Sequence, residues 1–149
     1  REGVTTLLMT FGIGAVVGNL AGGVLADRFG WRATLTALCI GQMVLMPLFS
    51  ALPVPDIALL VLAFTWSAVG WAFMSAQQMR LIGIAGPQAP VALALNAASI
   101  YVGAALGSAF GAWVIQTYGI QAIGIAAGAA AGLALIHITL SALWPPNPR

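Results

Sequence analysis

Long apolar runs separated by short polar breaks dominate the pattern of this chain. Breaks at charged residues and at proline and glycine clusters divide it into five segments, at 4–26, 32–52, 56–82, 90–117 and 119–144. Each segment reaches the roughly 20 residues that a helix needs to cross a bilayer. The segments lack the short apolar/polar alternation of barrel strands. The pattern predicts an all-α transmembrane fold of five helices, antiparallel to their sequence neighbours because the connections are short.

Composition indicates that lipid is the solvent of this chain. Only 5% of its 149 residues are charged and 61% are hydrophobic, with a mean hydropathy of +1.02. Soluble domains carry about 25% charged residues, so these charges are too few to cover a water-facing surface. The net charge of +2 is too small and too scattered for nucleic-acid binding. We therefore expect an integral membrane protein whose surroundings are the lipid bilayer.

The arginines predict the orientation of the helices. Arg28 and Arg32 flank the first connection and Arg80 precedes the third, whereas the second and fourth connections have no basic residue. The positive-inside rule then places the arginine-bearing side, and with it the C-terminus, in the cytoplasm. The chain begins with Arg1 rather than methionine, and its first apolar run is too long for a signal peptide. We expect it to be a piece of a longer protein.

The first connection carries the most informative motif, which reads GVLADRFGWRATL from Gly23 onward. Gly23 allows close backbone approach, and Gly30 allows a turn with positive φ. Asp27 is suited to face a helix N-terminus, where the macrodipole favours an anion. Arg28 and Arg32 can reach carbonyl or carboxylate oxygens. A generic arginine-containing loop with a turn glycine is the alternative interpretation.

This motif resembles the G-x-L-A-D-R-x-G-R-K-x-x-L loop signature of the major facilitator superfamily. Every specified position matches except Trp31, where the family usually has arginine, and Arg32 keeps the charge of the usual lysine. The family has this signature between its second and third spans and a weaker copy between its eighth and ninth. The resemblance therefore implies that residues 1–149 are a C-terminal helical bundle, about spans 8–12 of 12, whose partner is the N-terminal half. It also implies a conformational latch at Gly23, Asp27, Arg28, Gly30 and Arg32.

Glycines recur at helical spacing and predict faces on which helices pack closely. Small residues four positions apart let two helix backbones approach in lipid. The first predicted helix carries one such stripe and the fourth another, at Gly14, Gly18, Gly22 and at Gly103, Gly107, Gly111. The stretch 95–107 also resembles the eleventh span of the drug:proton antiporter and arabinose-efflux branch, which implies efflux.

Five side chains are candidates for a substrate cavity. The third predicted helix carries Trp66, Ser67 and Met74 on one face, together with Gln77 and Gln78, and the fourth carries Asn96 and Tyr101. Tryptophan packs against apolar ligands, while hydroxyl and amide groups hydrogen-bond them. Helix packing is the alternative for Trp66, and approach to the membrane interface is the alternative for the two glutamines. For Asn19 and Asn96, bonding to a neighbouring helix and contact with a ligand both stay open, whereas Gln42 is expected to bond a neighbouring helix.

No predicted span has an acidic residue in its middle, since Asp27 and Asp56 lie at span ends and Glu2 lies before the first. Proton coupling typically uses an intramembrane carboxylate, which we therefore expect in the N-terminal part. No pattern for a metal, a cofactor or an enzyme nucleophile is present. We expect a proton-coupled efflux antiporter for small organic molecules, in a bacterial inner membrane. The alternatives are an uptake permease and a non-transporting receptor or scaffold bundle.

Overall fold

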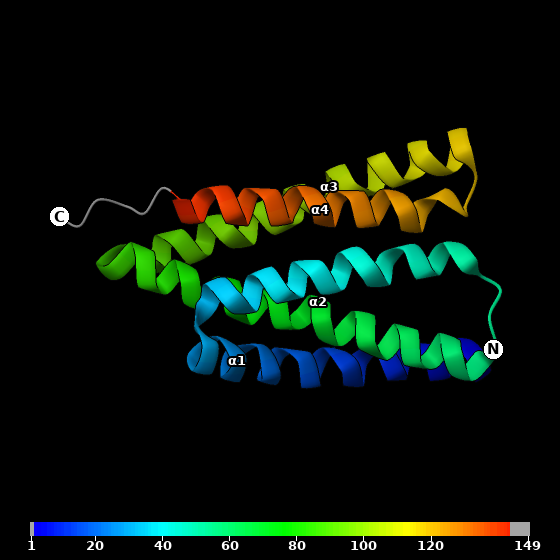
Figure 1. The fold of residues 1–149 in the computed structure, drawn as a ribbon, viewed down its shortest axis with the longest axis horizontal. Coiled ribbons are helices and arrows are strands. Elements are labelled where there is room, and N and C mark those ends of the chain that lie inside the picture. The colour runs from blue at the N-terminus through cyan, green and yellow to red at the C-terminus, as the bar shows by residue number, and fades with distance from the viewer. Residues whose placement is uncertain (1, 144–149) are drawn as a thin grey trace.

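The computed structural model describes residues 2–143, which form helices and no strand (Figure 1). The elements are α1 (Glu2–Leu48), the 3-10 turn η1 (Phe49–Ala51), α2 (Asp56–Ala85), the 3-10 turn η2 (Gly86–Gln88), α3 (Ala89–Tyr118) and α4 (Ala122–Leu143). The predicted all-α fold is confirmed.

Helix α1 consists of two helices that run in opposite directions and meet at Gly30 (Figure 1). Gly30 has φ 79° and ψ 151°, a conformation that side chains with a Cβ rarely adopt. The hydroxyl of Thr34 donates a hydrogen bond of 3.0 Å to the Gly30 carbonyl. This bond gives a partner to a carbonyl near the helix break. Gly86 and Gly119 also have positive φ, where the chain leaves α2 and α3.

Three helical stretches are long and apolar enough to cross a membrane, at Glu2–Ala51, Asp56–Tyr118 and Ala122–Ser141. The first two have 50 and 63 residues, whereas one crossing takes about 20 residues. Each of the two long stretches reverses direction, the first at Gly30 and the second at Gly86 (Figure 1). Five segments therefore arise from three stretches, and each segment is antiparallel to the next one along the chain.

The first half of α1 packs backbone to backbone against α2. A Cβ atom added to Gly14 would lie 2.6 Å from the Phe64 carbonyl oxygen. Cβ atoms on Gly18 and Gly22 would each lie 2.6 Å from a Cα atom, that of Ala68 and that of Ala72. Residue numbers rise by four on both sides of the contact, from Gly14 to Gly22 on α1 and from Phe64 to Ala72 on α2. The first half of α1 and α2 therefore run parallel. We call this contact the glycine seam.

Two serines of α2 add hydrogen bonds across the glycine seam. Ser67 donates to the Phe11 carbonyl at 2.6 Å. Ser75 donates to the Asn19 carbonyl at 2.8 Å and also contacts the Asn19 side chain. Asn19 therefore bonds a neighbouring helix, which is one of the two roles that its position at membrane depth left open. Such bonds satisfy polar groups that lipid cannot hydrate.

Helix α4 packs antiparallel on the second half of α1. Cβ atoms on Gly124 and Gly128 would lie 2.5 Å from the Met46 carbonyl oxygen and 2.9 Å from Cγ of Pro47. The Ile125 N–H donates to the Ser50 hydroxyl oxygen at 3.2 Å. Glycines thus form the α1–α4 contact as well.

Helix α3 is the least covered of the four α-helices in the described residues. Along its described length, Val114 is the only buried residue. The close packing expected of its glycine stripe is not found at Gly103 or Gly107, where an added Cβ would meet no heavy atom within 4 Å. Among the described residues, only Gly111 of this stripe has a close neighbour. Cδ1 of Ile123 lies 3.3 Å from the position that a Cβ atom on Gly111 would take.

Candidate substrate pocket

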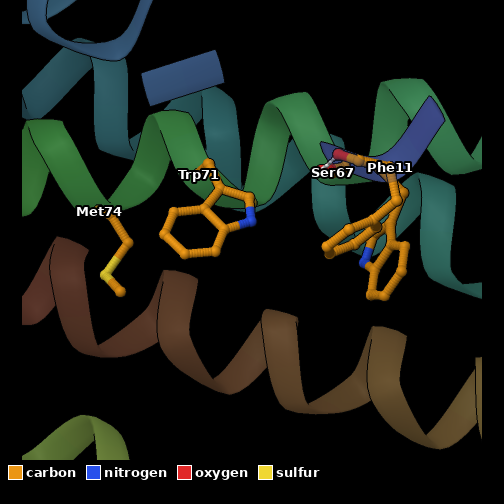
Figure 2. A pocket seen from close by; sticks show the side chains of 6 residues that line it. Phe11, Ser67, Trp71 and Met74 are labelled. Atoms are coloured by element: carbon orange, nitrogen blue, oxygen red, sulfur yellow. Dashed lines mark hydrogen bonds between the residues drawn. The ribbon is translucent and has the colours of Figure 1, made fainter. Parts of the chain in front are cut away.

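A pocket of about 180 Å³ lies against α2 and is lined by Phe11, Trp66, Ser67, Gly70, Trp71 and Met74. Five of these residues come from α2 and one from the first half of α1. Figure 2 shows the side chains of Trp71 and Met74 projecting from α2 on the same side. We call this cavity the aromatic pocket.

Trp66 is the best-anchored ring of the aromatic pocket. Its ring centroid lies 5.3 Å from that of Phe11 and 5.4 Å from that of Phe49. The two interplanar angles, 50° and 73°, are the tilted and edge-to-face arrangements that aromatic pairs favour. Two helices and the η1 turn therefore hold this indole in place.

Trp66 also borders a second cavity, of about 520 Å³, at the end of the bundle where α4 begins. Its other lining residues are almost all apolar: Met46, Phe49, Leu52, Ile120, Gln121, Ile123, Gly124 and Ala127. One indole thus forms part of the wall of both cavities.

Most polar groups beside the aromatic pocket already make hydrogen bonds, whereas Oε1 of Gln42 is buried without a partner among the described residues. Ser67 is 2% exposed and its hydroxyl donates to the Phe11 carbonyl. Gln42 donates from Nε2 to the Trp66 carbonyl at 3.3 Å, so it bonds a neighbouring helix as expected. A Cβ on Gly70 would lie 3.0 Å from that amide nitrogen. The pocket therefore offers chiefly aromatic and thioether surface to a ligand.

The structure brings together three of the five predicted cavity residues. Trp66, Ser67 and Met74 line the aromatic pocket, whereas Asn96 and Tyr101 on α3 do not. Tyr101 is 77% exposed. No described residue of α3 lines either cavity.

Sequence reasoning missed Phe11 and Trp71 as cavity residues. Phe11 stands in an apolar helix where no local pattern separates a cavity residue from a core residue. Trp71 lies five positions after Trp66, which places it roughly 140° around an ideal helix. A search for residues on one helical face therefore excludes it, although a bulky ring can reach the same cavity.

The predicted latch residues lie at the arginine-bearing end of the bundle. Asp27 and Arg28 are exposed. Asp27 makes no hydrogen bond or ion pair with any described residue, so the expected contact with a helix N-terminus is not found within residues 2–143. The close approach expected at Gly23 is also absent, since nothing lies within 4 Å of its Cβ position. Gly22 makes that approach instead, because one residue turns the helix by about 100°.

Trp31 replaces the arginine of the family signature and binds two arginines. The guanidinium carbon of Arg80, on α2, lies 4.9 Å from the indole centroid, and that of Arg32 lies 5.1 Å away. Both distances are within the range of cation–π attraction. Arg80 also donates to the Ser141 hydroxyl on α4 and to Oε1 of Gln77. Trp31 and Arg80 therefore link α1, α2 and α4.

These features define an integral membrane protein built as a bundle of helices, with an aromatic pocket against one of them. The chain belongs to the Major Facilitator Superfamily, whose sequence model matches residues 2–149. This confirms the resemblance of the loop motif.

Curated relatives are similar along most of the chain. It is 31% identical over 145 residues to the inner membrane transport protein YdhP of Escherichia coli K12, which covers 97% of this chain and 37% of that protein. It is 27% identical over 117 residues to the uncharacterised MFS-type transporter YbcL of Bacillus subtilis 168, covering 78% and 30%. The chain thus spans about a third of the length of these relatives. No solved structure matches it significantly.

Proposed function

We propose that this chain forms part of a secondary active transporter that exports small organic molecules in exchange for protons. Membership in a transporter superfamily supports transport. The observation that carries the proposal is the aromatic pocket, where Trp66, Trp71 and Met74 provide an apolar lining between helices. Ligand pockets are mostly apolar concavities of this kind. The protein acts in the inner membrane with its arginine-bearing end in the cytoplasm.

Alternating access requires one rigid unit to move against another about the substrate site. The glycine seam and the α1–α4 contact supply the rigid unit, because interlocked backbones cannot slide without collision. The exposed carboxylate of Asp27 supplies the changing contact, together with Arg28 and Arg32, which follow it in the sequence. In this proposal these groups bind the other half of the transporter in one of its two states.

Proton binding is assigned outside the five spans. The acidic residues Asp27 and Asp56 lie at ends of helical segments, and Glu2 lies in the first turn of α1. Intramembrane proton relays use carboxylate or histidine side chains facing the bundle interior. His137 of α4 is exposed rather than interior. The substrate pocket therefore lies among these helices, and the proton-binding group lies in another part of the protein.

Transport in inverted membrane vesicles tests the proposal. The full-length protein is expected to accumulate members of a panel of aromatic drugs and sugars when the vesicle interior is made acidic. Trp66→Ala should reduce the rate about two- to tenfold, the loss expected from one aromatic contact of 0.5–1.5 kcal/mol. Trp66→Phe should retain most of it.

Trp113→Ala is the matched control. Trp113 is 52% exposed on α3 and stacks on Phe110 with ring centroids 5.9 Å apart, away from both cavities. Equal losses in the Trp66 and Trp113 variants would contradict a substrate site beside Trp66. Substrate movement in the opposite direction would favour uptake over efflux. No movement of any compound would support a scaffold or receptor bundle.

A further inference from the structure

Two cations share one indole at the end of the bundle where α1 reverses. Arg80 and Arg32 both lie over the ring of Trp31, at 4.9 and 5.1 Å from its centroid. Trp31 is half-buried and packs against the core made by α1, α2 and α4. The indole ring that holds the two guanidiniums is therefore fixed by packing against the helix bundle.

The charge of these cations is not neutralised within the described residues. Neither arginine has an ion pair with a carboxylate there. Arg80 presents five N–H donors but finds only neutral acceptors, the hydroxyl of Ser141 and, at 3.4 Å, Oε1 of Gln77. Its Nε is buried without an acceptor. A partly buried cation in this condition favours an anionic ligand.

The cluster lies where the helices end. Trp31 follows the break at Gly30, Arg80 lies in the last turns of α2, and Ser141 lies in the last turn of α4. Figure 1 shows the break in α1 and the end of α4 at the same end of the bundle. In a membrane-spanning bundle this level is the headgroup region, where the anions at hand are lipid phosphates.

We propose that Arg32 and Arg80, held over Trp31, bind the phosphodiester of an anionic phospholipid headgroup. Guanidinium groups match phosphate oxygens because their N–H donors form a planar fork. The indole orients the two arginines without competing for their outward donors. The lipid would fill the position that an acidic side chain occupies in an ordinary ion pair, and it would join the end of α2 to the loop after the first span.

Native mass spectrometry of the full-length protein tests this site. The protein is released from nanodiscs made of equal parts phosphatidylglycerol and phosphatidylcholine, and the retained lipids are counted. Wild type should retain phosphatidylglycerol preferentially. Arg80→Gln and Arg32→Gln should each lower that retention roughly fivefold, which corresponds to about 1 kcal/mol per arginine near anionic lipid. Arg80→Lys should give an intermediate value, because the charge remains and the fork is lost.

Two control variants separate the site from general effects. Arg28→Gln removes an arginine of the same loop that lies over Phe29 at 5.5 Å rather than over Trp31. Ser141→Ala removes the Arg80 contact with α4 but keeps both cations. Both should retain the lipid as wild type does.

Three outcomes would overturn the proposal. Unchanged retention in Arg80→Gln would remove the site, and an equal loss in Arg28→Gln would reduce it to overall surface charge. Displacement of the lipid by added inorganic phosphate would identify a site for free phosphate instead. A loss in Ser141→Ala equal to that in Arg80→Gln would show that Arg80 acts only by joining α2 to α4.

Discussion

Gly18 lies so close to Ala68 that a Cβ atom on Gly18 would stand 2.6 Å from the Ala68 Cα. Real Cβ atoms do not approach backbone atoms so closely, so the two helices touch at a point where no side chain fits between them. In lipid this proximity supplies the van der Waals packing that replaces the hydrophobic drive of water. The stability of the bundle therefore depends on the absence of a Cβ atom at glycines such as Gly18.

Gly18→Ala should destabilise the bundle by about 1–3 kcal/mol, the usual cost of overpacking a close contact. The new methyl group forces α1 and α2 apart and weakens the bonds from Ser67 and Ser75. Thermal unfolding in detergent measures the effect. Gly12→Ala is the control, since nothing lies within 4 Å of its Cβ position in the same helix. That variant should be neutral or slightly stabilising, and equal losses would contradict the seam.

Ser67→Ala should also lower stability, through loss of the hydrogen bond to the Phe11 carbonyl. Interhelical bonds in membranes contribute about 0.6 kcal/mol on average, and this one is short and buried. We expect a loss of about 0.5–1.5 kcal/mol. Ser99→Ala is the matched control, because Ser99 bonds its own helix at Leu95 on an exposed face. A smaller loss for Ser67 than for Ser99 would argue against the interhelical bond.

Trp31→Arg restores the residue that the family signature usually has, yet it should weaken this protein. The change removes the ring that holds Arg32 and Arg80 and adds a third positive charge beside them. Cation–π contacts contribute about 0.5–2 kcal/mol each, more when partly desolvated. Phe29→Arg is the comparison, since Phe29 is 60% exposed and holds only Arg28. Unfolding midpoints should fall further for Trp31→Arg, and the reverse order would contradict the role of the indole.

Asp27→Asn should slow transport without lowering the amount of folded protein. An exposed carboxylate facing a helix N-terminus contributes about 0.3–1 kcal/mol. If that contact forms in one transport state only, its loss changes the ratio of states by about two- to fivefold. Transport rate normalised to folded protein is the measurement. Reduced stability with a normal rate would instead mean that Asp27 serves only its own helix.

The sequence was sufficient for the helices and for the break at Gly30. Long apolar runs and a glycine in an arginine-containing loop are local signals, and they predicted the segments on either side of the turn. Gly14, Gly18 and Gly22 were recognisable as one face, because four-residue spacing is a property of a single helix. A local pattern cannot identify the helix that packs against this glycine face, which is α2 in the structure.

The cavity residues show the same limit. Trp66 and Met74 follow from the face of one helix, but Phe11 belongs to another helix and Trp71 to another face. The meeting of Arg80 with Trp31 depends on how α2 lies beside the loop after the first span. Asn96 and Tyr101 have the residue types of a cavity wall, yet neither lines the aromatic pocket. In each of these cases, the way the helices pack together determines which side chains meet, and no local sequence pattern records that packing.

The parallel course of the glycine seam has a consequence for how the protein is made. Phe11 and Ser67 are 56 residues apart in the chain, and the contact between their helices forms only after the helix between them has entered the membrane. At a synthesis rate of roughly 5–20 residues per second, the first helix waits several seconds for its partner. During that interval its glycine face stays open to lipid and to other helices. Contacts between this face and other helices therefore compete with the glycine seam until the later helix emerges.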